Sequence, residues 1–268
     1  MNFSFLFFSC LALPVASCTG ENENKQLRSE EKNNTQLVVN SVPEKENFFS
    51  QEYLIGKFNQ KTDSSFALIP LKYCSKEGMY LRKETIAAFV KMYDAAKKEG
   101  VNLKIISATR NFSEQKSIWE AKWNGSRLVN GKNLSQTIKD PVERAKIILR
   151  YSSMPGTSRH HWGTDMDLNS LENSYFNSAE GKKIYEWLKK NAAAFGFCQP
   201  YSMKNETRLN GYEEEKWHWS YIPLSSVILK EYLQKIKPEN ITGFAGAETA
   251  GKLNIIEHYV KGVNPECR

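Results

Sequence analysis

Cysteine and histidine are scarce in this chain, which limits the kinds of metal site that it can hold. Of the 268 residues, five are cysteine and four are histidine. No two cysteines have the Cys-x-x-Cys spacing of thiolate zinc sites, which argues against a site of that kind. No internal repeat is visible either, so the sequence gives no support to a repeat architecture.

Charge of one sign is not concentrated in any part of the chain. Lysine and arginine number 37 and aspartate and glutamate 30, which gives a net charge of +7. The basic residues alternate with acidic and apolar ones, and no basic-aromatic recognition motif accompanies them. We therefore expect no nucleic-acid partner, although a basic surface favours anionic surroundings.

The chain contains one long uncharged apolar run, at residues 1–17. This run is too short for a typical membrane span and ends in small residues, as a secretory signal peptide does, although it lacks the usual Lys or Arg. Its end, Val15-Ala16-Ser17-Cys18, resembles a bacterial lipobox. We expect a lipoprotein signal peptide and a lipid on Cys18, with an ordinary signal peptide as the alternative. The lipoprotein hypothesis predicts an exported protein held on a membrane and facing the periplasm or cell wall.

Residues 18–47 contain no aromatic residue and are rich in Glu, Asn, Lys and Ser. Such a segment buries too little apolar surface to offset the entropy of ordering it, so we expect a flexible tether. Beyond Cys18, the remaining cysteines are Cys74, Cys198 and Cys267. Two of these three could form a disulfide in an oxidising compartment, and the sequence does not decide which.

Residues 48–235 have the apolar density of a folded domain, and helical patterns alternate with short strand patterns. We expect an α+β domain here, followed by a C-terminal extension over residues 236–268 that wraps around it. The expected helices cover residues 83–99, 140–151, 181–196 and 225–233. A strand is expected over residues 101–108, and an extended segment is expected to start at Phe197.

The segment "SRHHWGTDMD", residues 158–167, concentrates potential metal ligands and acid-base groups. Gly163 permits a bend that would let His160 and Asp167 converge in a loop that enters a strand. Downstream, Glu215 precedes His218 by three residues. Two imidazoles and one carboxylate are the ligands of a catalytic zinc site, and a nearby glutamate can take a proton from the bound water. The spacing alone also allows structural or surface histidines.

Three motifs in this order resemble the VanY-type zinc D-alanyl-D-alanine carboxypeptidases. Residues 158–167 are similar to the family's Ser-x-His-x-x-Gly-x-Ala-x-Asp motif, and residues 215–221 are similar to its Glu-x-Trp-His motif. The segment "SATRNFSEQ", residues 107–115, resembles the Ser-x-x-Arg segment that follows a strand. The resemblance covers roughly residues 50 to 225. It implies a single compact zinc-peptidase domain at residues 48–235, with a small antiparallel sheet flanked by helices.

Carried over to this chain, the resemblance implies a role for each matching residue. The expected Zn²⁺ ligands are His160, Asp167 and His218. Glu215 would be the general base, and Arg110 would stabilise the charge that develops on the scissile carbonyl oxygen. Gln115 and Ser158 would contact the peptide, with Ser158 as the candidate contact for its terminal carboxylate.

The sequence departs from the family pattern at Asp165, where the family usually has Ala. The second carboxylate could add a metal ligand, tune the bound water or point away from the metal. At alternate positions of a strand, Asp165 and Asp167 would share a face, and Asp167 is the expected ligand because the family's Asp falls there.

The activity implied by the resemblance is removal of the terminal D-Ala from peptidoglycan stem peptides. An L,D-carboxypeptidase or endopeptidase acting on the same peptides is an alternative, as is a wall-binding lipoprotein without catalysis. The expected partners are peptidoglycan stem peptides and, through the lipid anchor, a membrane. We expect the protein to be a monomer.

Overall fold

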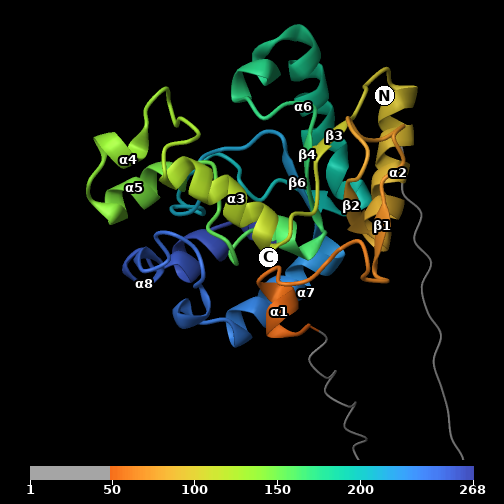
Figure 1. Ribbon diagram of the computed structural model, residues 1–268. Helices are drawn as coiled ribbons and strands as arrows, with labels where there is room; N and C mark the ends of the chain where they lie inside the picture. The colour runs from red at the N-terminus through yellow and green to blue at the C-terminus, as the bar shows by residue number, and fades with distance from the viewer. Residues whose placement is uncertain (1–48) are drawn as a thin grey trace, which may run out of the picture. The chain divides into compact units, whose positions relative to one another are not determined.

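A four-stranded antiparallel sheet lies at the centre of residues 49–268, the part of the chain that the computed structural model describes (Figure 1). The strand order is β3 (Ile105–Ser107), β4 (Asp165–Leu168), β6 (His218–Tyr221) and β5 (Phe197–Cys198). A separate two-stranded sheet pairs β1 (Phe66–Leu68) with β2 (Tyr80–Arg82). Together with the helices around these strands, this is the expected α+β class.

The two faces of the central sheet differ in chemistry because side chains alternate along each strand. On β4, Met166 and Leu168 belong to one hydrophobic core, whereas Asp165 and Asp167 point to the opposite face. Strand β6 has the same two faces, because Asp167 of β4 pairs with His218 and Met166 pairs with Trp219. The strand pairing therefore places polar side chains from two distant segments on one face of the sheet.

Helices α2 (Lys83–Lys98) and α6 (Ala179–Asn191) pack against the apolar face, in a core that also contains Met166, Leu168 and Trp219. The prediction for residues 83–99 is confirmed to within one residue. The predicted helix stop at Gly196 is confirmed, with φ of 81°, and Phe197 starts strand β5 as expected. The last turn before Gly196 is a 3₁₀ turn (η3, Ala192–Phe195), because α6 itself ends at Asn191.

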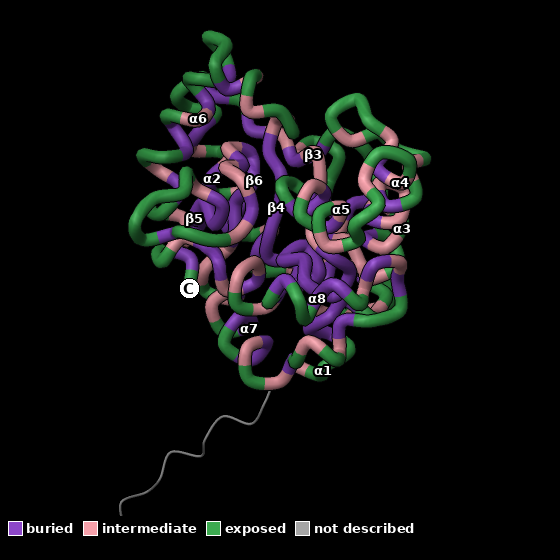
Figure 2. Tube along the Cα trace, turned by 90° about the vertical axis from the view of Figure 1, so that its left-hand side faces the viewer, coloured by how far each residue is buried: buried purple, intermediate pink, exposed green. Residues whose placement is uncertain are grey.

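The remaining helices form a second hydrophobic core around α3 (Phe112–Trp123), α5 (Pro141–Ile148) and α7 (Ile222–Lys235). Short helices α1 (Gln51–Leu54), α4 (Leu134–Thr137) and α8 (Thr249–Lys252) complete it. Helix α5 starts as predicted, with Asp140 as N-cap and Pro141 in the first turn. Figure 2 shows β4 buried between the α2 and β5 side of the molecule and the α3, α4 and α5 side.

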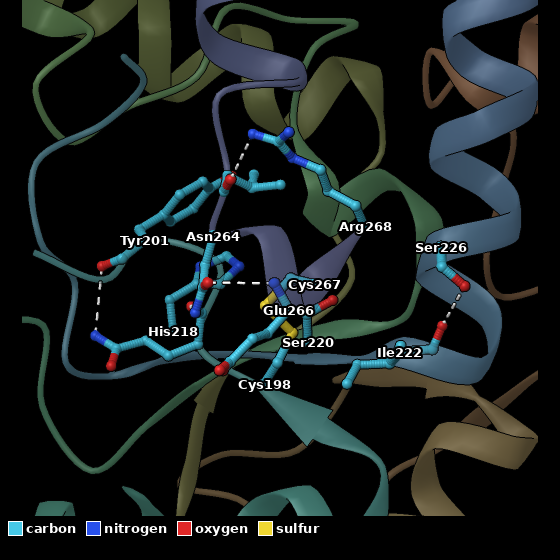
Figure 3. Close-up of a disulfide and its surroundings, with 12 residues drawn as sticks. Cys198, Tyr201, His218, Ser220, Ile222, Ser226, Asn264, Glu266, Cys267 and Arg268 are labelled. Atoms are coloured by element: carbon cyan, nitrogen blue, oxygen red, sulfur yellow. Dashed lines mark hydrogen bonds between the residues drawn. A yellow bond between two sulfur atoms is a disulfide. The ribbon is translucent and has the colours of Figure 1, made fainter. Parts of the chain in front are cut away.

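Residues 236–268 pack into this second core, with Ile241, Leu253 and Val260 buried in it. The chain then ends at a disulfide between Cys198 and Cys267, which settles the pairing that the sequence left open (Figure 3). Since Cys198 pairs with Ser220 of β6, the disulfide joins the C-terminus to the sheet beside His218.

Cys74 is buried and has a free thiol. No helix within residues 49–268 is long and apolar enough to span a membrane. The predicted signal peptide, lipidated Cys18 and tether all lie outside the described residues.

Candidate metal centre and active site

The first histidine of the site is positioned by a tight turn that ends at Gly163. Residues Arg159–Trp162 form a 3₁₀ turn (η1), where the sequence analysis expected a loop, and Gly163 follows with φ of 71°. A Cβ atom at Gly163 would lie 2.3 Å from the Phe66 ring. Only glycine satisfies both the positive φ and this close approach, and the turn then leads directly into β4.

Three side chains converge at the end of this turn on the polar face of the sheet. Nε2 of His160 lies 3.4 Å from Oδ2 of Asp167, and Nδ1 of His218 lies 3.1 Å from Oδ1 of Asp167. One potential ligand atom from each residue lies within 4.8 Å of the others. All three residues are buried, so the predicted ligand set is brought together.

The unused atoms of this trio suit a metal ion. His160 donates its Nδ1–H to the Ala108 carbonyl at 2.8 Å, and the Nε2 of His218 contacts Asp165 at 3.0 Å. The nitrogens that remain are those facing Asp167. Oδ1 of Asp167 is buried and accepts no hydrogen bond from residues 49–268, which is costly unless a cation binds there. The donor set of two imidazoles and one carboxylate fits Zn²⁺.

The charges of the trio are strongly coupled. Burial alone would raise the pKa of Asp167, but His160 and His218 hold it well below its ordinary value. Burial would likewise lower the pKa of His218, but its contacts with Asp165, Asp167 and Glu215 hold it well above the usual value. The centre therefore keeps Asp167 as a carboxylate, as a metal ligand requires.

Asp165 lies behind His218, on the side of the ring away from Asp167. Its Oδ1 accepts from Nε of Arg159 at 2.9 Å, and its Oδ2 accepts from Thr164 at 2.6 Å and Ser220 at 3.0 Å. Both oxygens are therefore occupied by the protein. Of the three roles left open by the sequence, the structure supports neither a metal ligand nor a side chain that points away, because Asp165 contacts and orients His218. An influence of Asp165 on the bound water stays a prediction.

Glu215 lies beside the trio, just before β6. Its Oε2 is 3.4 Å from Nδ1 of His218, and its backbone N–H donates to the Tyr201 carbonyl at 2.9 Å. Burial raises the pKa of Glu215, while His218 and Arg110 oppose the rise. A buried carboxylate with a raised pKa next to a metal centre is suited to general acid–base chemistry.

Arg110 and Gln115 face the same centre from the segment after β3 and from α3. Nη1 of Arg110 lies 3.7 Å from Oδ2 of Asp167, and its Nε donates to the Gln115 side chain at 3.0 Å. Gln115 in turn donates to the Ser153 carbonyl at 2.8 Å. Gln115 therefore orients Arg110 toward the centre, in addition to lining the cavity.

Ser158 and His161 are both buried, and neither lines the cavity. The Ser158 hydroxyl makes no hydrogen bond within the described chain, and its predicted contact with the peptide stays a prediction. His161 is structural, as expected: it accepts from the Gly156 N–H at 3.0 Å and donates to the Arg110 carbonyl at 2.6 Å. Burial lowers the pKa of His161 to about 3, so the ring is neutral.

The trio opens onto a cavity of about 540 Å³. Its lining includes His160, Asp167, His218, Glu215, Arg110 and Gln115, and also Trp217, one of the two tryptophans of its motif of which one was expected to form a wall of the site. Further lining residues were not predicted from the sequence, among them Lys122, Arg127, Arg150, Ser152, Ser153, Tyr201 and Tyr212. Most of the second group come from α3 or from loops without a motif. Lys122 had one usable signal, because it lies seven residues after Gln115 and thus on the same face of a helix.

Several solved structures resemble this chain. The structure of LdcB, described as an LD-carboxypeptidase, has 26% sequence identity and a TM-score of 0.48, and the match covers 68% of this chain and 81% of LdcB. VanYB in complex with D-alanine-D-alanine has 25% identity and a TM-score of 0.43, over 60% of this chain and 86% of VanYB.

Sequence comparison gives the family. The Bacillus subtilis protein named "Putative carboxypeptidase YodJ" is 33% identical over 170 residues, 59% of this chain and 55% of YodJ. A D-alanyl-D-alanine carboxypeptidase from Enterococcus faecalis is 27% identical over 154 residues, 54% of this chain and 53% of the relative. The chain thus spans about half the length of these curated relatives. The family model "VanY: D-alanyl-D-alanine carboxypeptidase" matches residues 78–224, more than half of the chain and all of the site just described, so the chain belongs to the VanY family.

Proposed function

We propose that this protein is a zinc-dependent D-alanyl-D-alanine carboxypeptidase that removes the terminal D-Ala from peptidoglycan stem peptides. The observation that carries the proposal is the convergence of His160, Asp167 and His218 with Glu215 and Arg110 in one cavity. Membership of the VanY family and the names of the relatives support the same substrate class.

The residues of the cavity divide the work of hydrolysing an amide. Zn²⁺ held by the trio would supply a Lewis acid and a water of lowered pKa. Glu215 accepts a proton from the attacking water and passes it to the leaving amine, so that the water oxygen joins the carbonyl carbon as the C–N bond breaks. Arg110, held by Gln115, places positive charge where the carbonyl oxygen becomes negative. The trio and Glu215 are buried, and low local dielectric strengthens their electrostatic interactions.

An L,D-carboxypeptidase acting on the shortened tetrapeptide stem is the second candidate. The metal trio and Glu215 suit both reactions, because the bond broken is an amide in each. The two activities differ in the configuration of the residue before the scissile bond, which the cavity wall and not the metal must recognise. The same metal machinery also suits an endopeptidase that cuts cross-links.

The test is incubation of the full chain, purified in detergent and loaded with zinc, with defined pentapeptide, tetrapeptide and cross-linked stems. Mass spectrometry should show loss of one D-Ala from the pentapeptide. A chelator should abolish this activity and added Zn²⁺ should restore it, because the ligands are all protein side chains of one open centre. Loss of D-Ala from the tetrapeptide alone would move the protein to the L,D class, and cleavage of the cross-linked stem alone to the endopeptidases. Intact stems throughout would favour a binding role.

We also propose that the protein is an exported lipoprotein anchored through Cys18. Support comes from the apolar run at residues 1–17 and the small residues before Cys18. Replacement Cys18→Ala should shift the protein from the membrane fraction to a soluble or unprocessed form and abolish labelling by a fatty-acid analogue. Equal membrane recovery and labelling of both proteins would exclude Cys18 as the lipidated residue.

A further inference from the structure

One wall of the cavity is basic, and its basic residues have no role in the proposed hydrolysis. Lys122, Arg127 and Arg150 line the cavity together with the acidic centre formed by Asp167 and Glu215. Among residues 49–268, no carboxylate forms an ion pair with any of these three cations. Arg110 differs from them, because it already lies against Asp167.

Lys122 is the most constrained of the three. It belongs to the face of α3 that lines the cavity, together with Gln115 and Ile118 at helical spacing. Its Nζ donates to the Ser152 hydroxyl, which is its one side-chain partner in the described chain. A hydroxyl satisfies one of three N–H donors and none of the charge, so Lys122 holds a partly buried cation without a counterion.

The charge on Lys122 persists at neutral pH and is felt at the catalytic centre. Burial, together with Arg127 and Arg110, lowers the pKa of Lys122 to about 8, and Glu215 opposes this shift. A group with this pKa is mostly protonated at pH 7. Lys122 lines the same cavity as Arg110 and Glu215, the groups that would act on the scissile amide.

We propose that Lys122 and the Ser152 hydroxyl form a binding site for a carboxylate of the substrate peptide, with Arg127 and Arg150 adding positive potential beside it. The proposal rests on the proposed function, since it assigns a substrate group to the same cavity. A bound carboxylate supplies the counterion that Lys122 lacks and accepts a charge-assisted hydrogen bond in a partly desolvated site. The basic wall then selects peptides with a free carboxylate near the scissile bond over neutral ones.

Two carboxylates of a stem peptide have this chemistry: the one at the C-terminus and any on a side chain. They are distinguished with three peptides of one sequence, the free acid, its C-terminal amide, and a form amidated at the side-chain carboxylates. Each amide removes one negative charge and keeps the shape of the group.

The experiment measures the Kd of each peptide by calorimetry on the zinc-loaded full chain carrying Glu215→Gln, so that the peptides stay intact. In this background we compare Lys122→Met with Lys116→Met. Lys116 is the matched control, because it lies on α3, contacts Glu120 and the Gly243 carbonyl, and does not line the cavity. Zinc content and the melting temperature show whether each variant folds.

We expect the parent to bind the free acid about tenfold or more tightly than one of the two amides. Lys122→Met should remove that preference by weakening the binding of the free acid while leaving the Kd of the amides unchanged. Lys116→Met should keep the preference, and Lys122→Arg should retain part of it. The amide that binds weakly identifies the carboxylate.

The proposal is overturned if folded, zinc-loaded Lys122→Met binds the free acid as tightly as the protein that carries Glu215→Gln alone. It is also overturned if the protein with Glu215→Gln alone binds the free acid and each of the two amides with the same Kd. The same holds if the parent binds none of the peptides. These outcomes are separate from failure of the proposed function, which is measured as hydrolysis of stem peptides by the protein with Glu215 intact.

Discussion

Replacement Glu215→Gln is expected to lower kcat for stem-peptide hydrolysis by about 10² to 10⁴, the usual contribution of a general base. The glutamine has the same shape but cannot accept the proton of the attacking water. Because Glu215 is not one of the three expected ligands and contacts His218 from beside the trio, the variant should still bind zinc. The loss should therefore fall on kcat, with KM changed much less.

The control for this measurement is the adjacent residue. Glu214 contacts the Tyr185 hydroxyl at 3.3 Å and does not line the cavity, so Glu214→Gln should retain activity within about twofold of the parent. Steady-state rates, zinc content and melting temperature of the two variants are compared at one pH. A Glu215→Gln protein that holds zinc and hydrolyses stems at the parent rate would show that the proton goes elsewhere.

Much of the site was predictable because its residues lie in short motifs. The turn at Gly163 and the alternation along β4 are local features, and both follow from residue type and spacing. Residue spacing also predicted that Asp165 and Asp167 share a face. Helices with strong amphipathic patterns, such as α2, were also predictable, because the spacing of apolar residues along a helix is a local feature of the sequence.

The parts that could not be predicted depend on contacts between distant segments. The role of Asp165 is set by the register of β4 against β6, which pairs it with Ser220 and puts the His218 ring within reach. The residues near Asp165 in the sequence do not indicate that register. The disulfide is similar, because Cys198 and Cys267 are 69 residues apart and meet only after the C-terminal segment packs into the core.

Lys122 shows a different kind of omission. Helix α3 starts with a capping box formed by Asn111 and Glu114, a pattern that predicts a helix start from sequence. Residues 107–115 resemble a family motif, and no helix was predicted beyond them. With the helix in place, Gln115 and Lys122 fall on one face, and the basic wall of the cavity could have been expected.

Replacement Asp165→Asn is expected to weaken zinc binding by about 10- to 100-fold, the usual effect of removing the partner of a metal-binding histidine. Asp165 accepts from the Nε2 of His218, which leaves Nδ1 of that ring to face Asp167. An asparagine can still contact the ring, but it no longer favours one tautomer and orientation. Zinc affinity is measured by competition with a chelator of known affinity, so the readout does not depend on catalysis.

The same replacement should also lower the free energy of unfolding by about 3–5 kcal/mol, because it leaves the buried Arg159 guanidinium without its counterion. The double variant Arg159→Met with Asp165→Ala separates the two effects. It removes both buried charges and restores the alanine of the family pattern, so stability should recover in large part. Zinc affinity should stay low, because His218 still lacks its acceptor. If the double variant instead recovers both the free energy of unfolding and the zinc affinity, Asp165 is not needed to orient His218, and the strand pairing alone orients that ring.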